Sequence, residues 1–465
     1  MPQLSTTGAR HGQAPHGQAP RGQAQRGLAQ RANQTSVKRG RTLASIAGTV
    51  LSLVLFANVA PTSVASPAGA FARAYRNVAA CAKPHQAGIA SCFALRRQTL
   101  MSGRAVGFGL KSRGDSAQVN GDAGFGATAL RKAYGIRALG ARTNVIAIVD
   151  ATHSGTAFDD VSEYRKTFGL PALTDCTVRG AAKGGVPSGT KPCFIQIDQN
   201  GVPSQNAATQ DTGWAQEIAL DLEMASAACP KCSLLLVEGA TASFEDLAAA
   251  VGTAATFGGV RSISNSYGGS DASADRFGQY AAAAAAGIAV TASSGDFGFG
   301  VESPASFDGV ISVGGTSLAV DANGSWLGES AWSGSGSGCS DLNPQPSWQA
   351  ASGTRCLGKV TADVAAVADP ATGVSVFFSG GWYVFGGTSA SSPLIAGLYA
   401  LKNDFGGRAG EFTALNADKL HDITSGTNAT SAATKRACKV ALWCNAGLGF
   451  DGPTGLGSPF GTAAF

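Results

Sequence analysis

A serine at the start of an apolar stretch is the first residue whose position suggests chemistry. Ser389 lies in Phe385-Gly-Gly-Thr-Ser-Ala-Ser-Ser-Pro393, and the residues that follow are mostly apolar. This order predicts that a Gly-Gly turn delivers Ser389 to the start of a helix, with Pro393 accommodated in the first turn. Free backbone N–H groups at that position can stabilise an oxyanion. An ordinary Ser-rich helix cap fits the same residues, so the motif alone does not define a nucleophile.

Two carboxyl groups could serve as the base that such a serine needs. Glu217 and Asp221 are four residues apart in Trp214-Ala-Gln-Glu-Ile-Ala-Leu-Asp, so on a helix they point to the same side. The apolar residues around them place the pair near buried surface. Two poorly solvated carboxyl groups tend to share a proton, and one of them can then act as a base at acidic pH. The alternative is a solvated acidic pair on an exposed helix.

A third acidic residue, Asp296, follows an apolar run in Ala292-Ser-Ser-Gly-Asp-Phe-Gly. This order places its side chain beyond the carboxyl end of a predicted strand. A protonated Asp there can donate a hydrogen bond to a developing oxyanion, provided that its pKa is raised. An Asx-turn that closes the strand is the competing interpretation.

No histidine lies in a context typical of a serine-activating base. The sequence has five: His11, His16, His85, His153 and His421. The first two lie in a repetitive N-terminal tail, and His85 precedes the predicted domain. His153 comes only three residues after Asp150, and His421 belongs to a different motif near the C-terminus. The base is therefore expected to be a carboxylate.

Taken in order, Glu217-x-x-x-Asp221, Ser-Gly-Asp296 and Gly-Thr-Ser389 resemble the motifs of the sedolisins, the serine-carboxyl peptidases of the subtilisin clan. The resemblance covers about residues 126–465. It implies an α/β, subtilisin-like fold, with a mostly parallel central sheet and helices on both faces, in a single large catalytic domain. It further implies an acyl-enzyme on Ser389, with Glu217 as general base and acid, Asp221 orienting Glu217, and Asp296 in the oxyanion hole. Asp150 would not be the catalytic acid.

The same resemblance implies two binding sites. One is a substrate-binding edge formed by Ser266, Tyr267, Gly268 and Gly269, where a peptide would pair as an added strand. The other is a site for one Ca²⁺ ion. Its carboxylates would be Asp422 and Asp451, and its backbone carbonyl ligands Ile423, Gly447 and Gly449. Oxygen ligands on flexible, Gly-containing backbone suit this ion.

Alternating strand and helix patterns must position these residues. Apolar, β-rich runs predict strands over 145–149, 234–237, 262–266, 288–292 and 310–313. Between them, Ser243-Phe-Glu-Asp246 predicts a capping box at the start of an Ala-rich helix. Nearly continuous apolar strands separated by helices are typical of a parallel sheet covered on both faces.

The ten cysteines fall into close neighbours, which predicts local disulfides in an oxidising compartment. The neighbours are Cys81/Cys92, Cys176/Cys193, Cys229/Cys232, Cys339/Cys356 and Cys438/Cys444. Sequence does not prove the pairing. The Cys229-Pro-Lys-Cys232 segment also fits a redox motif or half of a zinc site.

The N-terminal quarter has a different organisation. Residues 1–41 carry seven Lys or Arg and no acid, and we expect a disordered basic leader. Residues 42–70 read as a secretory signal, or as an uncleaved membrane anchor over 43–60. Residues 71–125 read as a short pro-segment or N-terminal extension, and residues 126–465 as the peptidase domain. The location would be extracellular, or the cell surface if the anchor is kept.

The charge distribution argues against a nucleic-acid partner. The net charge of +5 comes from the N-terminal region, because residues 126–465 carry 20 basic and 28 acidic groups. We expect polypeptide substrates and a monomer. Two other functions remain open: a catalytically silent relative that binds at a surface, and an esterase on an α/β sheet. The second lacks its usual motif, since no Gly-x-Ser-x-Gly surrounds Ser389.

Overall fold

The computed structural model describes residues 75–83, 86–99, 124–204, 210–402 and 404–465. These belong to one structural unit, Phe71–Phe465. The predicted leader and signal segment lie outside the described residues, as do 71–74, 84–85 and 100–123 of the predicted extension. Within the described residues, no helix combines the length and the apolar character that crossing a membrane requires.

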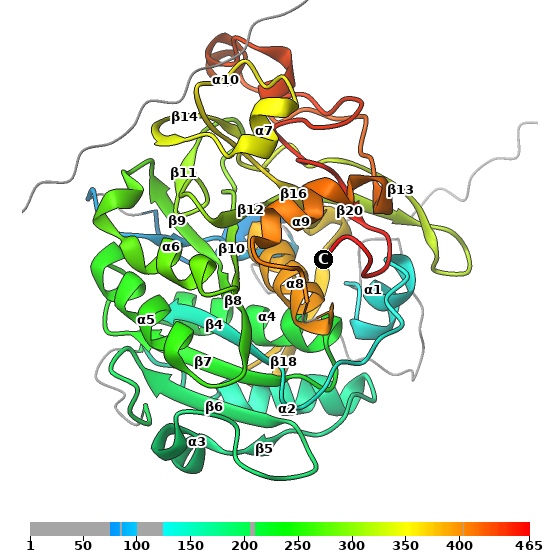
Figure 1. The fold of residues 1–465 in the computed structure, drawn as a ribbon. Helices are drawn as coiled ribbons and strands as arrows, with labels where there is room; N and C mark the ends of the chain where they lie inside the picture. The colour runs from blue at the N-terminus through cyan, green and yellow to red at the C-terminus, as the bar shows by residue number, and fades with distance from the viewer. Residues whose placement is uncertain (1–74, 84–85, 100–123, 205–209, 403) are drawn as a thin grey trace, which may run out of the picture. The chain divides into compact units, whose positions relative to one another are not determined.

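A nine-stranded sheet forms the centre of the unit (Figure 1). In spatial order its strands are β13 (Trp326–Ala331), β12 (Val310–Val320), β10 (Ala289–Ser293), β8 (Val260–Asn265), β4 (Val145–Ala151), β7 (Ser233–Gly239), β6 (Cys193–Asp198) and β5 (Thr174–Asp175), while β16 (Val364–Val367) pairs with β12. Only β13 is antiparallel to its neighbour. The five predicted strands are confirmed to within two residues at their starts, and the prediction of a mostly parallel sheet is confirmed.

Helices cover both faces of this sheet because successive side chains of each strand point to opposite sides. On one face, Ile146 and Ile148 of β4 pack with residues of α2 (Ala157–Thr167), α4 (Thr212–Ala228) and α8 (Thr388–Lys402). On the other, Val145, Ala147 and Val149 pack with α5 (Phe244–Thr256) and α6 (Gly278–Ala285). The runs 145–149 of β4 and 234–237 of β7 are entirely apolar, because both faces of these strands are buried.

Two of these helices begin at side-chain caps. The Asp211 carboxylate accepts hydrogen bonds from the N–H groups of Gly213 and Trp214 and so begins α4. The Ser243 hydroxyl accepts the Asp246 N–H, which confirms the predicted start of α5. In a full capping box the Asp246 side chain would also accept the N–H of Ser243. Here the Asp246 carboxylate accepts hydrogen bonds from the side chains of Gln199 and Thr241 instead.

Helix α8 passes next to α4 through the interior of the unit (Figure 1). A Cβ atom on Gly397 would lie 2.4 Å from the Cβ of Ala228, so glycine is needed for this close approach. The sequence predicted Pro393 in the first turn of the helix, but it lies in the second turn of α8. The helix tolerates it there with one backbone hydrogen bond fewer.

The described part of the predicted N-terminal extension is integrated into the fold. Strand β2 (Ser91–Cys92) pairs with β9 (Tyr267–Ser270). Strand β3 (Leu95–Thr99) joins a second sheet in the order β1-β3-β18-β17, with β1 at Tyr75–Ala79, β18 at Gly381–Gly386 and β17 at Val374–Phe378. A boundary at residue 126 therefore does not separate two folded units. Whether residues 71–125 are removed during maturation stays a prediction.

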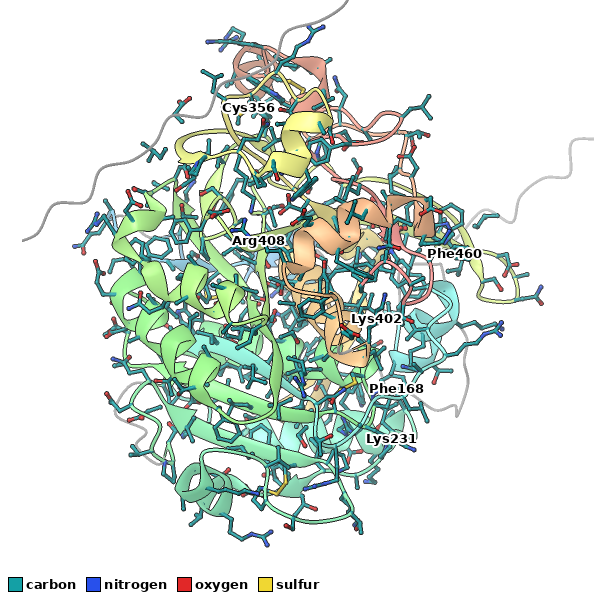
Figure 2. The ribbon with its side chains drawn as sticks, viewed as in Figure 1. Phe168, Lys231, Cys356, Lys402, Arg408 and Phe460 are labelled. Carbon is teal, nitrogen blue, oxygen red and sulfur yellow. A yellow bond between two sulfur atoms is a disulfide. The ribbon has the colours of Figure 1, made fainter. Side chains whose placement is uncertain are left out.

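All ten cysteines are paired, each with the neighbour expected from the sequence. Figure 2 labels Cys356, the partner of Cys339, beside helix α7 (Ser347–Ala351). Cys229 and Cys232 are fully buried and bridged at the end of α4, and the described residues hold no cluster of metal-ligating side chains around them. This pair is therefore a structural disulfide and not half of a zinc site.

Candidate active site

Ser389 is the second residue of α8 and is fully buried. The turn before it depends on Gly387, whose φ of 98° lies in the region that favours glycine. The Ser389 hydroxyl donates a hydrogen bond to the carbonyl oxygen of Ser266, over 3.3 Å. The serine thus lies at the start of the helix, as predicted, next to the end of strand β8.

Glu217 and Asp221 lie one turn apart on α4, and neither is accessible to solvent. Burial raises the pKa of Glu217 well above its ordinary value, and the negative charge of Asp221 raises it further. The Ser389 hydroxyl lies close enough to Glu217 to lower the pKa of that carboxyl in part. Burial also raises the pKa of Asp221. The structure therefore brings this pair to Ser389 and excludes an exposed acidic pair.

Asp296 follows β10, and its side chain bonds to Thr388, the residue before Ser389. One of its oxygens, Oδ1, accepts hydrogen bonds from the Thr388 N–H (2.8 Å) and the Thr388 hydroxyl (2.9 Å). The other, Oδ2, is buried and has no hydrogen-bond partner among the described residues. Burial raises the pKa of Asp296 to about 7. Part of the residue is exposed, but Oδ2 of the carboxyl group is closed to water.

Asp296 therefore remains protonated in weakly acidic solution. Its bonds from Thr388 tie it to the residue next to Ser389. The free Oδ2–H can donate a hydrogen bond into the space in front of the serine. An Asx-turn alone would leave the side chain bonded to its own loop, whereas this side chain bonds to α8.

A fourth buried acid, Asp150, lies behind the pair. It is fully buried at the end of β4, and neither of its carboxyl oxygens has a hydrogen-bond partner in the described chain. Burial raises the pKa of Asp150, and the charge of Glu217 raises it further. Asp150 in turn raises the pKa of Asp221. The only sign of this contact in the sequence is an acidic residue directly after the apolar run 145–149.

The predicted substrate-binding edge is paired with the chain itself. Strand β9, which contains Tyr267, Gly268 and Gly269, has antiparallel neighbours on both sides, β2 and β11 (Glu302–Ser303). In the register with β2, Ser91 lies opposite Gly268. The carbonyl oxygen of Ser266 accepts a hydrogen bond from the N–H of Phe93 (3.3 Å). This edge therefore accepts an extended strand in the way that was predicted for a peptide.

Ala94 is a contact of the site that sequence reasoning missed. Its N–H donates a hydrogen bond to Oε2 of Glu217 over 2.7 Å. Residues 91–97 have neither the regular apolar alternation of a strand nor a catalytic motif, so their place beside Glu217 could not be read from the sequence. The tie between Thr388 and Asp296 was missed for a related reason, since these residues are far apart in the chain.

The predicted calcium ligands come from two loops, at 422–423 and 447–451, that contact each other. Oδ2 of Asp451 accepts the Gly447 N–H (2.9 Å), and Oδ2 of Asp422 accepts the Gly449 N–H (3.0 Å). The two carboxylates lie close enough to repel each other. The carbonyl oxygens of Ile423, Gly447 and Gly449 accept no hydrogen bond from the described residues. The five predicted residues therefore offer oxygen donors that fit a hard divalent cation.

Comparison with known proteins finds similarity over part of the chain. The model of the subtilase family matches residues 229–442. Kumamolisin of Bacillus sp. (strain MN-32) is 36% identical over 206 residues, which cover 38% of this chain and 36% of the relative. Sedolisin of Pseudomonas sp. (strain 101) is 31% identical over 211 residues, which cover 38% of this chain and 34% of the relative. The matched region thus spans about a third of the length of these curated relatives.

A solved structure extends the likeness in fold beyond this region. The structure of Pseudomonas sedolisin, described as a serine-carboxyl proteinase in complex with two molecules of pseudo-iodotyrostatin, has a TM-score of 0.59 and 23% sequence identity. The match covers 73% of this chain and 96% of that one. The predicted α/β, subtilisin-like fold is therefore confirmed.

Proposed function

We propose that this chain, which is similar to sedolisin and kumamolisin over part of its length, is a sedolisin-like serine-carboxyl endopeptidase that hydrolyses polypeptides at acidic pH. One observation carries the proposal. Ser389, the Glu217–Asp221 pair and Asp296 come from three separate parts of the chain and are held against one another in a buried site. A carboxyl base next to a serine, with a second carboxyl group facing it, fits acyl transfer.

In this mechanism Ser389 Oγ attacks the carbonyl carbon of the substrate, and Glu217 accepts the hydroxyl proton. Glu217 then gives this proton to the leaving amine, and water resolves the acyl-enzyme by the reverse sequence. Asp221 interacts with Glu217 from one helical turn away and orients it. Protonated Asp296, together with the N–H of Ser389, stabilises the oxyanion.

The proposal sets two conditions on pH. Asp296 must keep its proton in order to donate, so activity is expected to fall as the pH rises through about 7. Glu217 must lose its proton in order to act as a base, so activity is also expected to fall as the pH drops below the raised pKa of that carboxyl. The optimum therefore lies on the acidic side of neutrality.

Cleavage of a peptide library, read by mass spectrometry between acidic and neutral pH, tests the function. We expect endoproteolytic products from the wild type and none from Ser389→Ala. Glu217→Gln should lower kcat/KM by about 10²–10⁴. Glu223→Gln is the matched control, because Glu223 is equally buried on α4 but accepts the Phe377 N–H, away from Ser389. Turnover of p-nitrophenyl esters without peptide products would indicate an esterase instead, and no turnover would indicate a binding protein.

We propose that Asp422, Asp451 and the carbonyl groups of Ile423, Gly447 and Gly449 hold one Ca²⁺ ion. Bound there, the ion would neutralise two carboxylates that repel each other and would tie two C-terminal loops together. It would act on stability and not on the reacting atoms. Saturating Ca²⁺ should add about 2–4 kcal/mol to the free energy of unfolding, seen as a rise in Tm. Asp451→Asn should abolish that rise, whereas Asp341→Asn, in strand β14 (Gly338–Pro344), should keep it.

We further propose that the protein is exported and acts outside the cell on polypeptides, as a monomer. Five disulfides and the predicted signal at 42–70 support export. N-terminal sequencing of protein recovered from the medium tests it. Recovery only in a membrane fraction would indicate that the 43–60 segment is kept as an anchor.

A further inference from the structure

A histidine that the proposed mechanism does not use lies at the end of the central sheet, near the buried acids. His153 follows β4 in a turn formed by Thr152, whose φ of 62° is rare for a β-branched residue. The Thr152 N–H donates to the carbonyl oxygen of Gly239, at the end of β7 (2.8 Å). The turn places the imidazole of His153 against the carboxyl group of Glu238, with Nδ1 2.9 Å from Oε2.

Glu238 is 3% exposed, and hydrogen-bond donors surround its carboxyl group. Its Oε1 accepts the Ser154 N–H (3.0 Å) and the Gln196 amide (2.7 Å). Its Oε2 accepts the Ser204 hydroxyl and the Nδ1–H of His153. Four donors suit a carboxylate, because a protonated carboxyl group would need an acceptor for its own hydrogen. With Nδ1–H directed at Glu238, Nε2 is the atom of His153 that takes a proton from solvent.

Strand register connects this pair to Asp150, the buried acid behind the Glu217–Asp221 pair. Strands β4 and β7 are parallel neighbours in the central sheet (Figure 1), and Asp150 lies directly opposite Glu238. Two residues earlier, Ile148 and Leu236 are also opposite each other, and both pack toward α4. Since side chains alternate along a strand, Asp150 and Glu238 point to that same face.

The two neighbouring carboxyl groups have different surroundings. No described residue donates a hydrogen bond to Asp150, whereas Glu238 accepts four. The negative charge therefore rests on Glu238 and the proton on Asp150, because two like charges so close together are disfavoured in a buried place. Burial raises the pKa of Asp150, and the charges of Glu217 and Glu238 raise it further.

His153 is the one cation that forms an ion pair with these acids in the described part of the chain. The other titratable groups near Asp150 and Glu238 are acids and a phenol: Glu217 and Asp221 on α4, Tyr267 on β9 and Asp198 on β6. The Asp198 carboxylate accepts N–H groups of its own turn. Asp160 of α2 is directed to the Ser379 N–H. The hydrogen bond to Glu238 raises the pKa of His153, so the imidazole stays charged in acidic solution.

We infer that Glu238 and His153 are positioning residues that set, from behind the catalytic pair, how readily Glu217 gives up its proton. The Glu238 carboxylate opposes a further negative charge on Asp150, Asp221 or Glu217, and protonated His153 offsets that effect. The inference rests on the proposed peptidase function, because Glu217 is the general base there. Since 14% of the His153 side chain is exposed, its charge follows the pH of the medium.

The acid limb of the pH profile of kcat/KM for peptide hydrolysis tests the inference, because it reports the proton that the free enzyme must lose. Glu238→Gln leaves the positive charge of His153 alone and should move this limb to lower pH. His153→Gln leaves the negative charge of Glu238 alone and should move the limb to higher pH. Each shift should be about 0.5–1 pH unit, the effect of a unit charge roughly 10–15 Å away inside a protein.

Two further variants separate an effect of charge from damage to the fold. The double variant His153→Gln/Glu238→Gln carries neither charge, so its acid limb should return close to that of the wild type. Structural damage would instead accumulate in the double variant. His153→Lys restores a positive charge and should reverse the shift of His153→Gln.

Glu329→Gln is the matched control for the change at Glu238. The Glu329 carboxylate also accepts hydrogen bonds from four side chains, those of Tyr134, Thr316, Trp326 and Ser458. It lies on β13, which β12, β10 and β8 separate from β4. Glu329→Gln should therefore leave the acid limb where it is in the wild type.

The imidazole provides a measurement that needs no turnover. An NMR titration of the Ser389→Ala protein gives the midpoint at which His153 loses its proton. Adding Glu238→Gln should lower this midpoint by about one pH unit, because the partner charge is gone. An unchanged midpoint would show that Glu238 does not hold the charge of His153 and would overturn the inference.

The results also distinguish this inference from the proposed function. If the wild type cleaves peptides but both single variants keep its acid limb, or shift it in the same direction, the inference is wrong and the peptidase function stands. If the wild type cleaves no peptide, the proposed function fails, and the inference fails with it.

Discussion

At the scale of single residues, the proposed mechanism uses a buried carboxyl group where serine chemistry usually has a histidine base. Glu217 is fully buried, next to Asp221 and near Ser389, and both burial and its neighbour raise its pKa. Asp296 is raised by burial to a pKa of about 7 and keeps a proton that it can donate. A proton acceptor and a proton donor of the same chemical type can therefore work side by side, because their surroundings differ.

The role of Asp296 predicts a change in pH dependence rather than a simple loss. An amide donates at any pH, so Asp296→Asn should remove the fall in kcat that the wild type shows as pH rises through about 7. Asp296→Ala has no donor and should lower kcat by about 10²–10³ at every pH. The measurement is the pH profile of kcat for peptide hydrolysis.

A control for this profile is available in an exposed turn. Asp321 accepts hydrogen bonds from the Asn323 and Ser325 N–H groups, and an asparagine can accept them equally. Asp321→Asn should leave the profile as it is in the wild type. An Asp296→Asn enzyme that still loses activity above neutral pH would contradict the proposed role of Asp296.

At the scale of elements, the site depends on two helices that touch. Helix α4 carries Glu217 and Asp221, and α8 carries Ser389. Their separation is set where Gly397 of α8 passes Ala228 of α4, with no room for a Cβ atom. The distance between Glu217 and Ser389 is therefore set by a close contact between the helices, some distance from either residue.

Enlarging this contact should disturb the site from a distance. Gly397→Ala should cost about 1–3 kcal/mol of folding free energy, because the added methyl group forces the helices apart. It should also lower kcat more than it raises KM. Urea denaturation and peptide kinetics measure the two effects.

Gly252→Ala in α5 serves as the control for this substitution. The nearest atom to an added methyl group there belongs to the flexible Gln279 side chain, 3.3 Å away. The change should be neutral or stabilise by up to about 1 kcal/mol, since alanine favours helix over glycine. If Gly397→Ala behaves like Gly252→Ala, the helix contact does not set the geometry.

The central strands and helix α4 could be predicted from the sequence because their burial leaves a regular apolar pattern. Strands such as β4 and β7 are buried on both faces and therefore read as unbroken apolar runs. Helix α4 was evident from the spacing of Glu217 and Asp221 among apolar residues. Strands β2 and β3 were not predicted, because their order comes from pairing with β9 and β18 and from a disulfide. Long-range pairing of this kind leaves no local periodicity.

Contacts within the site divide in the same way. The order of three motifs was enough to predict one site, which is formed by Glu217, Asp221, Asp296 and Ser389. The presence of Ala94 at Glu217 and of Asp150 behind the pair depends on how distant strands meet. A single acidic residue after a strand, or an alanine in an irregular segment, does not identify its partner.

At the scale of the whole molecule, buried acids make stability depend on pH. Burial raises the pKa of Glu302 to about 8 and that of Asp296 to about 7, and it also raises the pKa values of the Asp150, Glu217 and Asp221 carboxyls. Between about pH 4 and 8 the folded state therefore binds more protons than the unfolded chain. Stability must fall as the pH rises through this window.

The predicted size of this effect is large enough to measure. Since one pKa unit corresponds to about 1.4 kcal/mol, the free energy of unfolding should drop by at least about 2 kcal/mol from mildly acidic to mildly alkaline solution. Urea unfolding of the Ser389→Ala protein gives this difference without self-digestion. Glu302→Gln should make the dependence shallower. If the protein is more stable in alkaline than in acidic solution, burial does not disfavour the charged form of these carboxyl groups.

The disulfides connect each cysteine only to the next one along the chain, with separations of 11, 17, 3, 17 and 6 residues. A chain that enters an oxidising compartment with its N-terminus first would meet each correct partner before any later cysteine emerged. Vectorial oxidation therefore yields the native set without reshuffling. Release of the complete reduced chain from denaturant, by contrast, allows many wrong combinations, so biosynthesis and test-tube refolding should differ in yield for this protein.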